Sequence, residues 1–351
     1  MPDRAKPIPL TSRIRPLSRR GVCAGAFGFA VLASGCSRPS AEEEVRESVT
    51  GSTFAFDTYC TFTVYGDADA PALLARECAR FDGLFNAYDP DSDIARINAA
   101  GGAPVIVDPD TLELVQKGLE FSSQAQGRFD ITIGAVSMLW DFTSGRKPDD
   151  KEIQRAIGHV DWRGVEVDPD ASTVRLADPS AKLDLGGIAK GFVADRLCTT
   201  LSDRGCTAAV ISLGGNIVFH GRKPDGALWD AGIRDPNDPG GSTVVGTVHI
   251  PEGSLVTSGL YERMFESDGT TYWHILDPRT GMPVQTDIES VTVLCPSSTA
   301  ADALSTTLFI AGSVDGADMA HAHEGTAAYF IKRDGGTAES PRWQELTDFE
   351  A

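Results

Sequence analysis

Long hydrophobic runs are missing from this chain of 351 residues, and basic side chains are scarce beside acidic ones. Residues 21–35 form an uncharged stretch rich in glycine and alanine, shorter than the roughly 20 residues that a membrane-spanning helix needs. Six of the 31 basic residues but only one of the 50 acidic residues lie within residues 1–35. The remaining 25 basic and 49 acidic side chains repel phosphate backbones, so the composition disfavours nucleic-acid binding.

Cysteine is also sparse, and none of the seven cysteines stands in a CxxC pair or at metal-ligand spacing. A Walker A loop and a GxGxxG sequence are both absent, which excludes the two common nucleotide-binding fingerprints. Five cysteines follow residue 50. One disulfide, with Cys198 and Cys206 as the nearest pair, and buried free thiols are both compatible with these numbers.

The N-terminus contains the pattern of an export signal. Basic residues end at Arg20, the uncharged stretch follows, and Ala33-Ser34-Gly35 precede Cys36. Small residues before a cysteine resemble a bacterial lipobox, in which Cys36 would be lipidated; an ordinary signal peptide cleaved nearby is the alternative. We expect an exported lipoprotein anchored to the membrane, on the periplasmic side of the bacterial inner membrane. Its parts would be a signal peptide (1–35), a polar tether (36–50) and one catalytic unit (51–351).

Helix and strand patterns alternate irregularly after the tether. Apolar spacings of three and four predict helices at 71–88, 108–127, 187–201 and 298–312. Strands are predicted within 54–66 and at 182–185, 208–213, 216–220, 242–250, 270–276, 289–295 and 326–332. A turn is predicted at 257–259, and an irregular tail after Asp334. The absence of regular βαβ order favours an α+β fold.

The segment KLDLGGIAKGFVAD, residues 182–195, carries a glycine pair between a predicted strand and a helix. Glycines let the backbone approach a ligand, and the first N–H groups of the helix are free to meet an anion. Lys190 lies in the first helical turn, where it opposes the helix dipole unless an anion neutralises both. A phosphate-binding turn and a plain strand–helix joint remain equal alternatives.

Asp302 and Thr306 are four residues apart on a predicted helix and share one face. A carboxylate and a hydroxyl in this arrangement suit Mg²⁺, which takes few protein ligands and completes its shell with substrate phosphates. The alternative is structural, because an aspartate near a helix start favours the dipole and a threonine can bond back to its own helix.

The stretch WHILDPRTG, residues 273–281, places an imidazole, a carboxylate and a guanidinium beside a turn. If residues 270–276 form a strand, Tyr272, His274 and Leu276 point to one side. A lone histidine among apolar residues is usually a core side chain. The charged turn beside His274 instead favours a pocket, because strand ends are where pocket groups converge.

Eight segments in order resemble the FAD:protein FMN transferases of the ApbE family, from about Phe54 to Ile331. They are FDTYCTFTVYG, FNAYDPDSDIARIN, GRFDITIGAVSMLWDF, LDLGGIAKGFVAD, ISLGGNIVFHG, LVTSGLYERMF, HILDPRTGMPV and SVTVLCPSSTAADALSTTLFIAG. The resemblance implies a single T-fold-like unit of largely antiparallel sheets packed with helices. It also implies an enzyme that binds FAD with Mg²⁺, transfers FMN to a Ser or Thr hydroxyl of an acceptor flavoprotein subunit, and releases AMP.

The same resemblance implies roles for individual residues. Asp302, Thr306 and the carbonyl of Gly187 would bind the metal, while His274 and Asp277 would lie near the pyrophosphate, with His274 as the candidate base. The expected FAD contacts are Phe56, Tyr88, Arg128, Phe129, Asp130, Asp184, Lys190 and Ile275. Two positions depart from the family: Phe56-Asp57-Thr58 replaces Met-Gly-Thr, and Arg128 replaces a small residue.

Two other functions use the same residues. An FAD pyrophosphatase would use water in place of the acceptor hydroxyl and release free FMN and AMP. A non-catalytic flavin- or solute-binding lipoprotein would need the pocket but not the metal pair.

Overall fold

The computed structural model describes residues 47–238, 240 and 242–351, all within one compact unit, Val45–Ala351. The signal peptide predicted at 1–35 and Cys36 lie outside the described residues. An eight-stranded antiparallel sheet is central to this unit. Its order is β1 (Ser48–Ala55), β2 (Thr58–Tyr65), β6 (Ala209–Leu213), β7 (Asn216–His220), β10 (Gly253–Gly259), β13 (Ile288–Cys295), β14 (Ala327–Lys332) and β15 (Thr337–Glu339).

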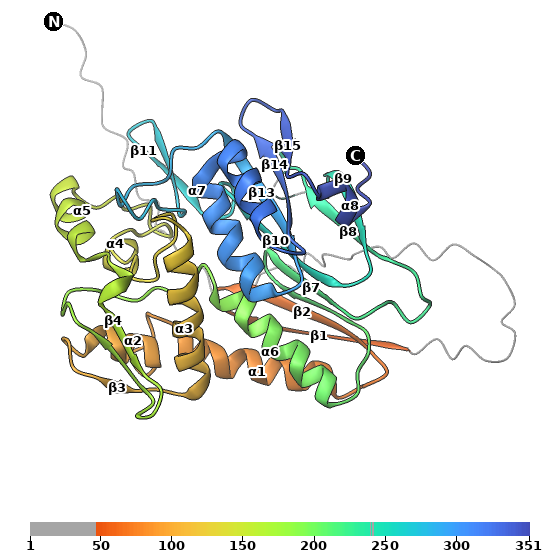
Figure 1. Ribbon diagram of the computed structural model, residues 1–351, viewed down its shortest axis with the longest axis horizontal. Helices are drawn as coiled ribbons and strands as arrows, with labels where there is room; N and C mark the ends of the chain where they lie inside the picture. Colours follow the sequence, from red (N-terminus) through yellow and green to blue (C-terminus); the bar gives the residue numbers. More distant parts are fainter. Residues whose placement is uncertain (1–46, 239, 241) are drawn as a thin grey trace, which may run out of the picture. The chain divides into compact units, whose positions relative to one another are not determined.

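Three helices cover one face of this sheet: α1 (Ala70–Phe85), α6 (Ala189–Asp203) and α7 (Ser298–Ala322) (Figure 1). Phe62 of β2 packs in the same core as Phe81 and Phe192 of the helices, and all three are almost fully buried. Helix α7 continues ten residues past its predicted end at residue 312. It is kinked at Gly312, where φ is 82°, a conformation that glycine adopts without a steric penalty.

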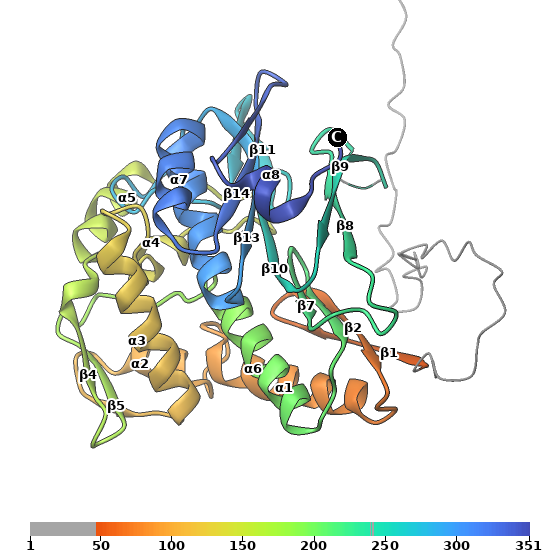
Figure 2. The ribbon, with the colours of Figure 1, turned by 45° about the vertical axis from the view of Figure 1, so that its right-hand side comes forward.

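The opposite face of the sheet is covered by the hairpin β8 (Trp229–Arg234) and β9 (Val244–Ile250) and by α8 (Trp343–Thr347). Figure 2 shows α7 and this hairpin on opposite sides of β10 and β13. Along β14, Tyr329 and Ile331 point into this second core while Phe330 points into the α7 core. Strands buried on both faces read as continuous apolar runs, as β14 does.

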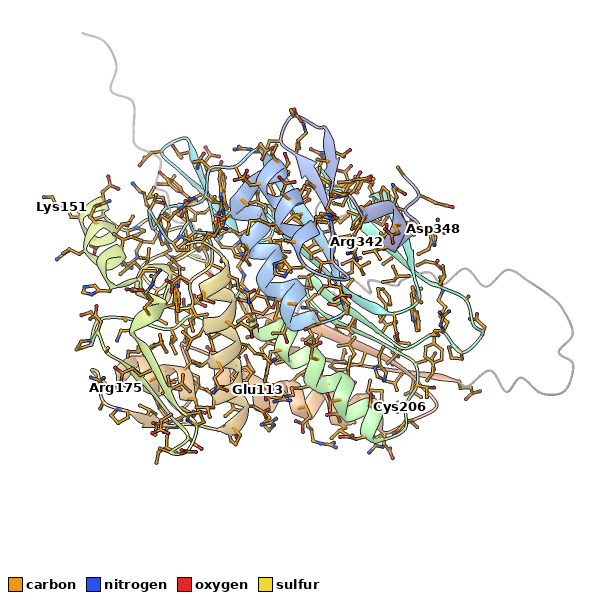
Figure 3. All side chains as sticks on the ribbon, viewed as in Figure 1. Glu113, Lys151, Arg175, Cys206, Arg342 and Asp348 are labelled. Atoms are coloured by element: carbon orange, nitrogen blue, oxygen red, sulfur yellow. The ribbon has the colours of Figure 1, made fainter. Side chains whose placement is uncertain are left out.

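A second group of elements packs beside α1, α6 and α7. It contains α2 (Asp93–Ala99), α3 (Pro109–Gln124), α4 (Gly134–Ser137), α5 (Asp150–Ala156), two 3₁₀ turns (Ile157–His159 and Trp162–Gly164), the sheet β3 (Val105–Ile106), β5 (Thr173–Leu176), β4 (Val165–Asp168), and the hairpin β11 (Met264–Ser267), β12 (Thr270–Trp273). Arg196 of α6 joins α3 to α6 through ion pairs with Asp110, at 2.9 Å, and with Glu113. Glu113 is labelled in Figure 3.

The fold class is confirmed, and several local predictions are wrong. Residues 182–185 form an isolated bridge, between Lys182 and Ile133, and no longer strand; the Asn98 amide bonds the N–H and the C=O of Leu183. Residues 257–259 form the end of β10 and not a turn, since Thr257 pairs with Thr292 of β13. The predicted tether ends early, because residues 48–50 already pair with β2.

The strand predicted at 270–276 ends at Trp273, so the side chains after it do not alternate. Ile275 is buried against α7, and Leu276 is buried in a separate cluster with Trp140. The chain passes between two cores here, so neighbouring residues are buried in succession. The tail is likewise ordered into β15 and α8, because Trp343 is completely buried beside Tyr329. Within the described part of the chain, no helix combines the length and apolar character needed to cross a membrane.

Candidate functional site

Helices α6 and α7 meet at Gly191, which brings Asp302 to the start of α6. The Gly191 N–H donates to Asp302 Oδ2 at 2.9 Å. A Cβ atom on this glycine would lie 2.2 Å from the carbonyl oxygen of Ser298, so the crossing requires glycine. Asp302 is only 4% exposed. A carboxylate this buried needs partners, since an unpaired buried charge is costly.

The partners of Asp302 come from the glycine turn before α6. Lys190 Nζ lies 3.7 Å from Asp302 Oδ1 and donates to the carbonyl oxygen of Gly186 at 3.2 Å. A Cβ atom on Gly187 would lie 3.3 Å from Thr306 Oγ1, so the turn faces Thr306 directly. We call Gly186, Gly187, Lys190, Asp302 and Thr306 the Gly187 cluster.

The Gly187 cluster offers the donor types that Mg²⁺ prefers: one carboxylate, one hydroxyl and backbone carbonyls. No group of three or more His, Cys, Asp or Glu side chains suited to a metal occurs among residues 47–238, 240 and 242–351. Asp302 contributes the one carboxylate of the Gly187 cluster, so an ion bound to it, to Thr306 and to the Gly187 carbonyl would take its remaining ligands from water or substrate oxygens. The residues fit a hard cation that shares its shell with a substrate, and do not fit zinc, which favours nitrogen and sulfur.

Asp184 fixes the shape of the glycine turn. Its Oδ1 accepts from the Gly186 N–H at 2.9 Å, and its Oδ2 accepts from Ser137 Oγ at 2.6 Å. Tyr88 is 74% exposed, and the charges of Asp184 and Arg263 act on its hydroxyl group. Tyr88 is therefore an exposed side chain on which the charge of Asp184 acts.

The β1–β2 turn holds Phe56 in an unusual backbone conformation. Phe56 and Asp57 have φ angles of 53° and 57°, as in a type I′ turn, which favours asparagine and glycine. The Phe56 N–H donates to Asp82 Oδ1 at 3.1 Å, and Asp57 pairs with Arg263 at 3.1 Å. Strained residues persist where their surroundings hold them, often at functional sites. These two contacts hold Phe56 and Asp57 in this turn.

Residues 128–130 lie on the other side of the glycine turn. Phe129 is buried, and its ring is the group that a Cβ atom on Gly187 would meet first. Arg128 donates to Asp315 of α7 at 3.1 Å, so its guanidinium is held outside the Gly187 cluster. Asp130 accepts from the N–H and hydroxyl of Thr132 and from the N–H of Trp162. Burial raises the pKa of Asp130, and the Thr132 and Trp162 bonds oppose that rise.

The WHILDPRTG stretch supplies His274, whose Nδ1 atom is buried although the residue as a whole is only partly buried. Its Nδ1 has no hydrogen-bond partner within the described part of the chain. Burial, and to a smaller extent the positive charges of Arg263 and Lys190, lower the pKa of His274 to about 4. The imidazole is therefore neutral at pH 7 and carries a lone pair that can accept a proton. The effect of Lys190 also connects His274 with the Gly187 cluster.

Asp277 makes its hydrogen bonds within its own turn. Its carboxylate accepts from Nε and a terminal nitrogen of Arg279, at 2.9 and 2.7 Å, and its backbone carbonyl accepts from Gly281. Ile275, a predicted FAD contact, is buried against α7, and its carbonyl accepts from the Val284 N–H. The observed role of Asp277 is to orient Arg279, and no contact places its carboxylate in the Gly187 cluster.

A cavity of about 360 Å³ lies beside Asp130 and Arg279. Asp130 and Arg279 line it together with Gly127, Trp162 and Pro278. Gly187, Lys190, Asp302 and Thr306 are not among its lining residues. The structure therefore brings the metal and lysine predictions together, leaves His274 near enough for the Lys190 charge to act on it, and places Asp130 and Arg279 at a separate cavity.

Glu262 and Arg263 were missed by the sequence analysis, although their segment LVTSGLYERMF was singled out. Glu262 Oε1 would lie 3.0 Å from a Cβ atom on Gly215, and the charges of Lys190 and Asp302 act on Glu262. Arg263 contacts the β1–β2 turn through Asp57, and its backbone carbonyl accepts the backbone N–H of His274 at 3.1 Å. Their only sequence signal was two charges after a glycine in an otherwise apolar segment.

Comparisons with known proteins show the family of this chain. The ApbE family model matches residues 56–330. This chain belongs to the ApbE family. An FAD:protein FMN transferase of Treponema pallidum is 38% identical over 267 residues, which cover 72% of this chain and 74% of that protein. One from Vibrio cholerae is 29% identical and covers 90% of this chain and 95% of its own length.

Solved ApbE structures share the fold. The ApbE protein of Thermotoga maritima has a TM-score of 0.78 and 29% identity, covering 86% of this chain and 99% of its own. The flavin transferase ApbE of Vibrio cholerae has a TM-score of 0.75 and 26% identity over 86% of this chain and 99% of its own. The family match begins at Phe56, so the β1–β2 turn is the first matched feature of this ApbE chain.

Proposed function

We propose that this ApbE-family chain is an Mg²⁺-dependent FAD:protein FMN transferase. It would attach the FMN half of FAD to a Ser or Thr hydroxyl of an acceptor flavoprotein subunit and release AMP. The observation that carries the proposal is the convergence of Gly187, Lys190, Asp302 and Thr306 at the α6–α7 crossing. The names of the curated relatives support the flavin chemistry.

Asp302, Thr306 and the Gly187 carbonyl would hold the metal, which would neutralise charge on the pyrophosphate oxygens when bound. Lys190 adds a fixed positive charge from the first turn of α6. Its ammonium group already faces two oxygens, those of Asp302 and Gly186, so it is oriented before substrate arrives. Groups positioned in advance lower the barrier because they need no rearrangement during the reaction.

His274 would act as the general base. The acceptor hydroxyl loses its proton to the imidazole as its oxygen bonds to the FMN phosphorus, and the bridging oxygen leaves with AMP. A neutral imidazole with an unpartnered Nδ1 supports this role, since a base must have its lone pair available. Asp277 orients Arg279, whose guanidinium borders the neighbouring cavity and can meet the adenosine side of the substrate.

We also propose that the protein is exported and lipidated at Cys36, with residues 37–47 as the tether. The basic N-terminal segment and the small residues before Cys36 support this. Fractionation of cells that express the wild-type chain and Cys36→Ala tests it. The wild type should sediment with membranes, and the variant should be recovered in soluble form. Equal membrane association of both would contradict lipid anchoring.

The activity is tested by incubating the protein with FAD, Mg²⁺ and a candidate acceptor subunit. Covalent in-gel flavin fluorescence on the acceptor supports transfer, whereas free FMN without labelled acceptor identifies a pyrophosphatase. Binding of FAD without either product identifies a flavin-binding protein. Asp302→Asn should abolish transfer, while Asp318→Asn, an exposed aspartate on the same helix, should leave it intact.

A further inference from the structure

The carboxylate of Asp195, on α6, caps the N-terminus of α7. It accepts hydrogen bonds from the backbone N–H groups of Ser298 and Thr299, both at 2.9 Å, and from the hydroxyl groups of Ser297 and Thr299, at 2.9 and 2.6 Å. The first N–H groups of a helix have no partner within that helix, and a negative charge beside them interacts favourably with the helix dipole. This one carboxylate therefore fixes the first turn of α7 against α6.

A second bond between the two helices runs in the opposite direction. Asp302 of α7 accepts the Gly191 N–H of α6 at 2.9 Å. Gly191 and Asp195 are four residues apart on α6, and Thr299 and Asp302 are three apart on α7, so each pair shares a helix face. Each helix thus supplies one carboxylate to the other, at points one turn apart, where α6 and α7 meet (Figure 2).

The start of α7 is also bonded to the main sheet. Ser298 is completely buried, its hydroxyl group donates to Asn216 Oδ1 at 2.9 Å, and the Ser254 hydroxyl donates to it at 3.0 Å. These bonds fix α7 over β7 and β10. Asp195 instead fixes α7 against α6, the helix that directly follows Gly187. The separation between α7 and the glycine turn therefore depends on the contact that Asp195 makes.

We propose that Asp195 is a positioning residue for the metal site, which sets the distance of Asp302 and Thr306 from the Gly187 carbonyl. The inference rests on the proposed function, which assigns those three groups to Mg²⁺. Thr306 follows Asp302 by one turn, so a shift of the first turns of α7 moves both groups together. Mg²⁺ demands near-ideal octahedral geometry with ligands at about 2.0–2.1 Å, so a small displacement weakens its binding.

Calorimetric titration of Mg²⁺ into the full chain, with and without FAD, tests the proposal. Asp195→Asn keeps the shape of the side chain but removes its charge and one of its two acceptor oxygens. Loss of the groups that orient metal ligands costs about 10- to 100-fold in affinity, so the Kd for Mg²⁺ should rise at least tenfold. In the transfer assay, the Mg²⁺ concentration for half-maximal rate should rise by the same factor. The rate at saturating Mg²⁺ should approach that of the wild type, because Asp195 acts only through the metal ligands.

Asp93→Asn is the matched control. Asp93 of α2 is likewise buried, and its carboxylate accepts the Asp108 N–H and the Thr111 hydroxyl at the start of α3, both at 2.8 Å. Both variants should lower the urea midpoint of unfolding, but Asp93→Asn should bind Mg²⁺ with the affinity of the wild type. An unchanged Kd in Asp195→Asn, or equal weakening in both variants, would overturn the proposal.

Thr299→Val supplies a milder perturbation in case Asp195→Asn does not fold. It removes only the 2.6 Å bond to Asp195 and should raise the Kd for Mg²⁺ by a smaller factor, whereas an unchanged Kd would overturn the proposal. Absence of Mg²⁺ binding by the wild type, or binding that survives Asp302→Asn, would overturn it as well. Mg²⁺ binding by a wild type that labels no acceptor would refute the transferase alone, because the comparison of Kd values needs no flavin transfer.

Discussion

Lowering the pH from 8 to 5.5 should leave kcat/KM for FAD nearly unchanged, although the proposed base is a histidine. The pKa of His274 is lowered to about 4, first by burial and then by the positive charges of Arg263 and Lys190. At pH 5.5 a group with a pKa of about 4 is only about 3% protonated, whereas an ordinary imidazole is about 90% protonated. The base therefore stays available through the mildly acidic range.

The same pKa has a consequence for stability. Unfolding restores an ordinary pKa of about 6.5, so the unfolded chain binds the His274 proton more tightly than the folded chain does. Stability is then lost as the pH falls from about 6.5 to 4. The difference of about 2.5 pKa units corresponds to about 3 kcal/mol at the acid limit, since one unit is about 1.4 kcal/mol. His274→Gln should remove this part of the acid sensitivity.

Two measurements check the reasoning. The pH profile of kcat/KM reports the pKa values of groups in the free enzyme. In a separate comparison, His274→Gln should lower the transfer rate about 10²- to 10⁴-fold with FAD binding retained. Urea unfolding between pH 7 and 4.5 compares the stability loss of wild type and variant, with His321→Gln as the surface control. An acidic limb near pH 6.5 that vanishes in His274→Gln would refute the neutral, buried imidazole.

The glycines of the site yield two further predictions. Gly187→Ala places a methyl group 3.3 Å from Thr306 Oγ1 and should weaken Mg²⁺-dependent transfer at least tenfold, measured by metal titration. Gly83→Ala, where the added atom meets nothing within 4 Å, should leave activity unchanged; equal losses would contradict a specific effect. Gly191→Ala places a methyl group 2.2 Å from the Ser298 carbonyl oxygen. Overpacking of this kind should lower the free energy of unfolding by about 1–3 kcal/mol in denaturant titration, and an unchanged value would contradict the tight crossing.

Helices whose signals are local could be predicted from the sequence. Asp108 accepts from the Asp110 N–H at the start of α3, and Gly127 follows the end of that helix with φ 78°. Both features depend on residues within one turn of the chain. The α+β class followed similarly from the order of the elements.

Elements set by distant contacts could not be predicted. Residues 182–185 have a strand-like pattern, yet the Asn98 side chain takes the hydrogen bonds of Leu183. His274 leaves its predicted strand because Ile275 and Leu276 enter different cores. The spacing of residues in the sequence indicates neither the Asn98–Leu183 hydrogen bonds nor the separate cores of Ile275 and Leu276, since both depend on tertiary packing.

The candidate site likewise combines features that the sequence could predict with features that it could not. The i, i+4 spacing of Asp302 and Thr306 placed them on one helix face. Their approach to Gly187 and Lys190 depends on the Gly191 crossing, which spacing could not reveal. Glu262 and Arg263 had no periodic signal, and they enter the region because Arg263 contacts the β1–β2 turn.

The intact mass of the acceptor subunit tests the central claim most directly. After incubation with FAD and Mg²⁺, wild-type enzyme should increase the acceptor mass by one FMN group less one water, with AMP released in equal amount. Asp302→Asn should give no increase, and Asp318→Asn should match the wild type. Undiminished labelling by Asp302→Asn, or AMP release with no mass gained by the acceptor, would contradict metal-dependent transfer at the Gly187 cluster.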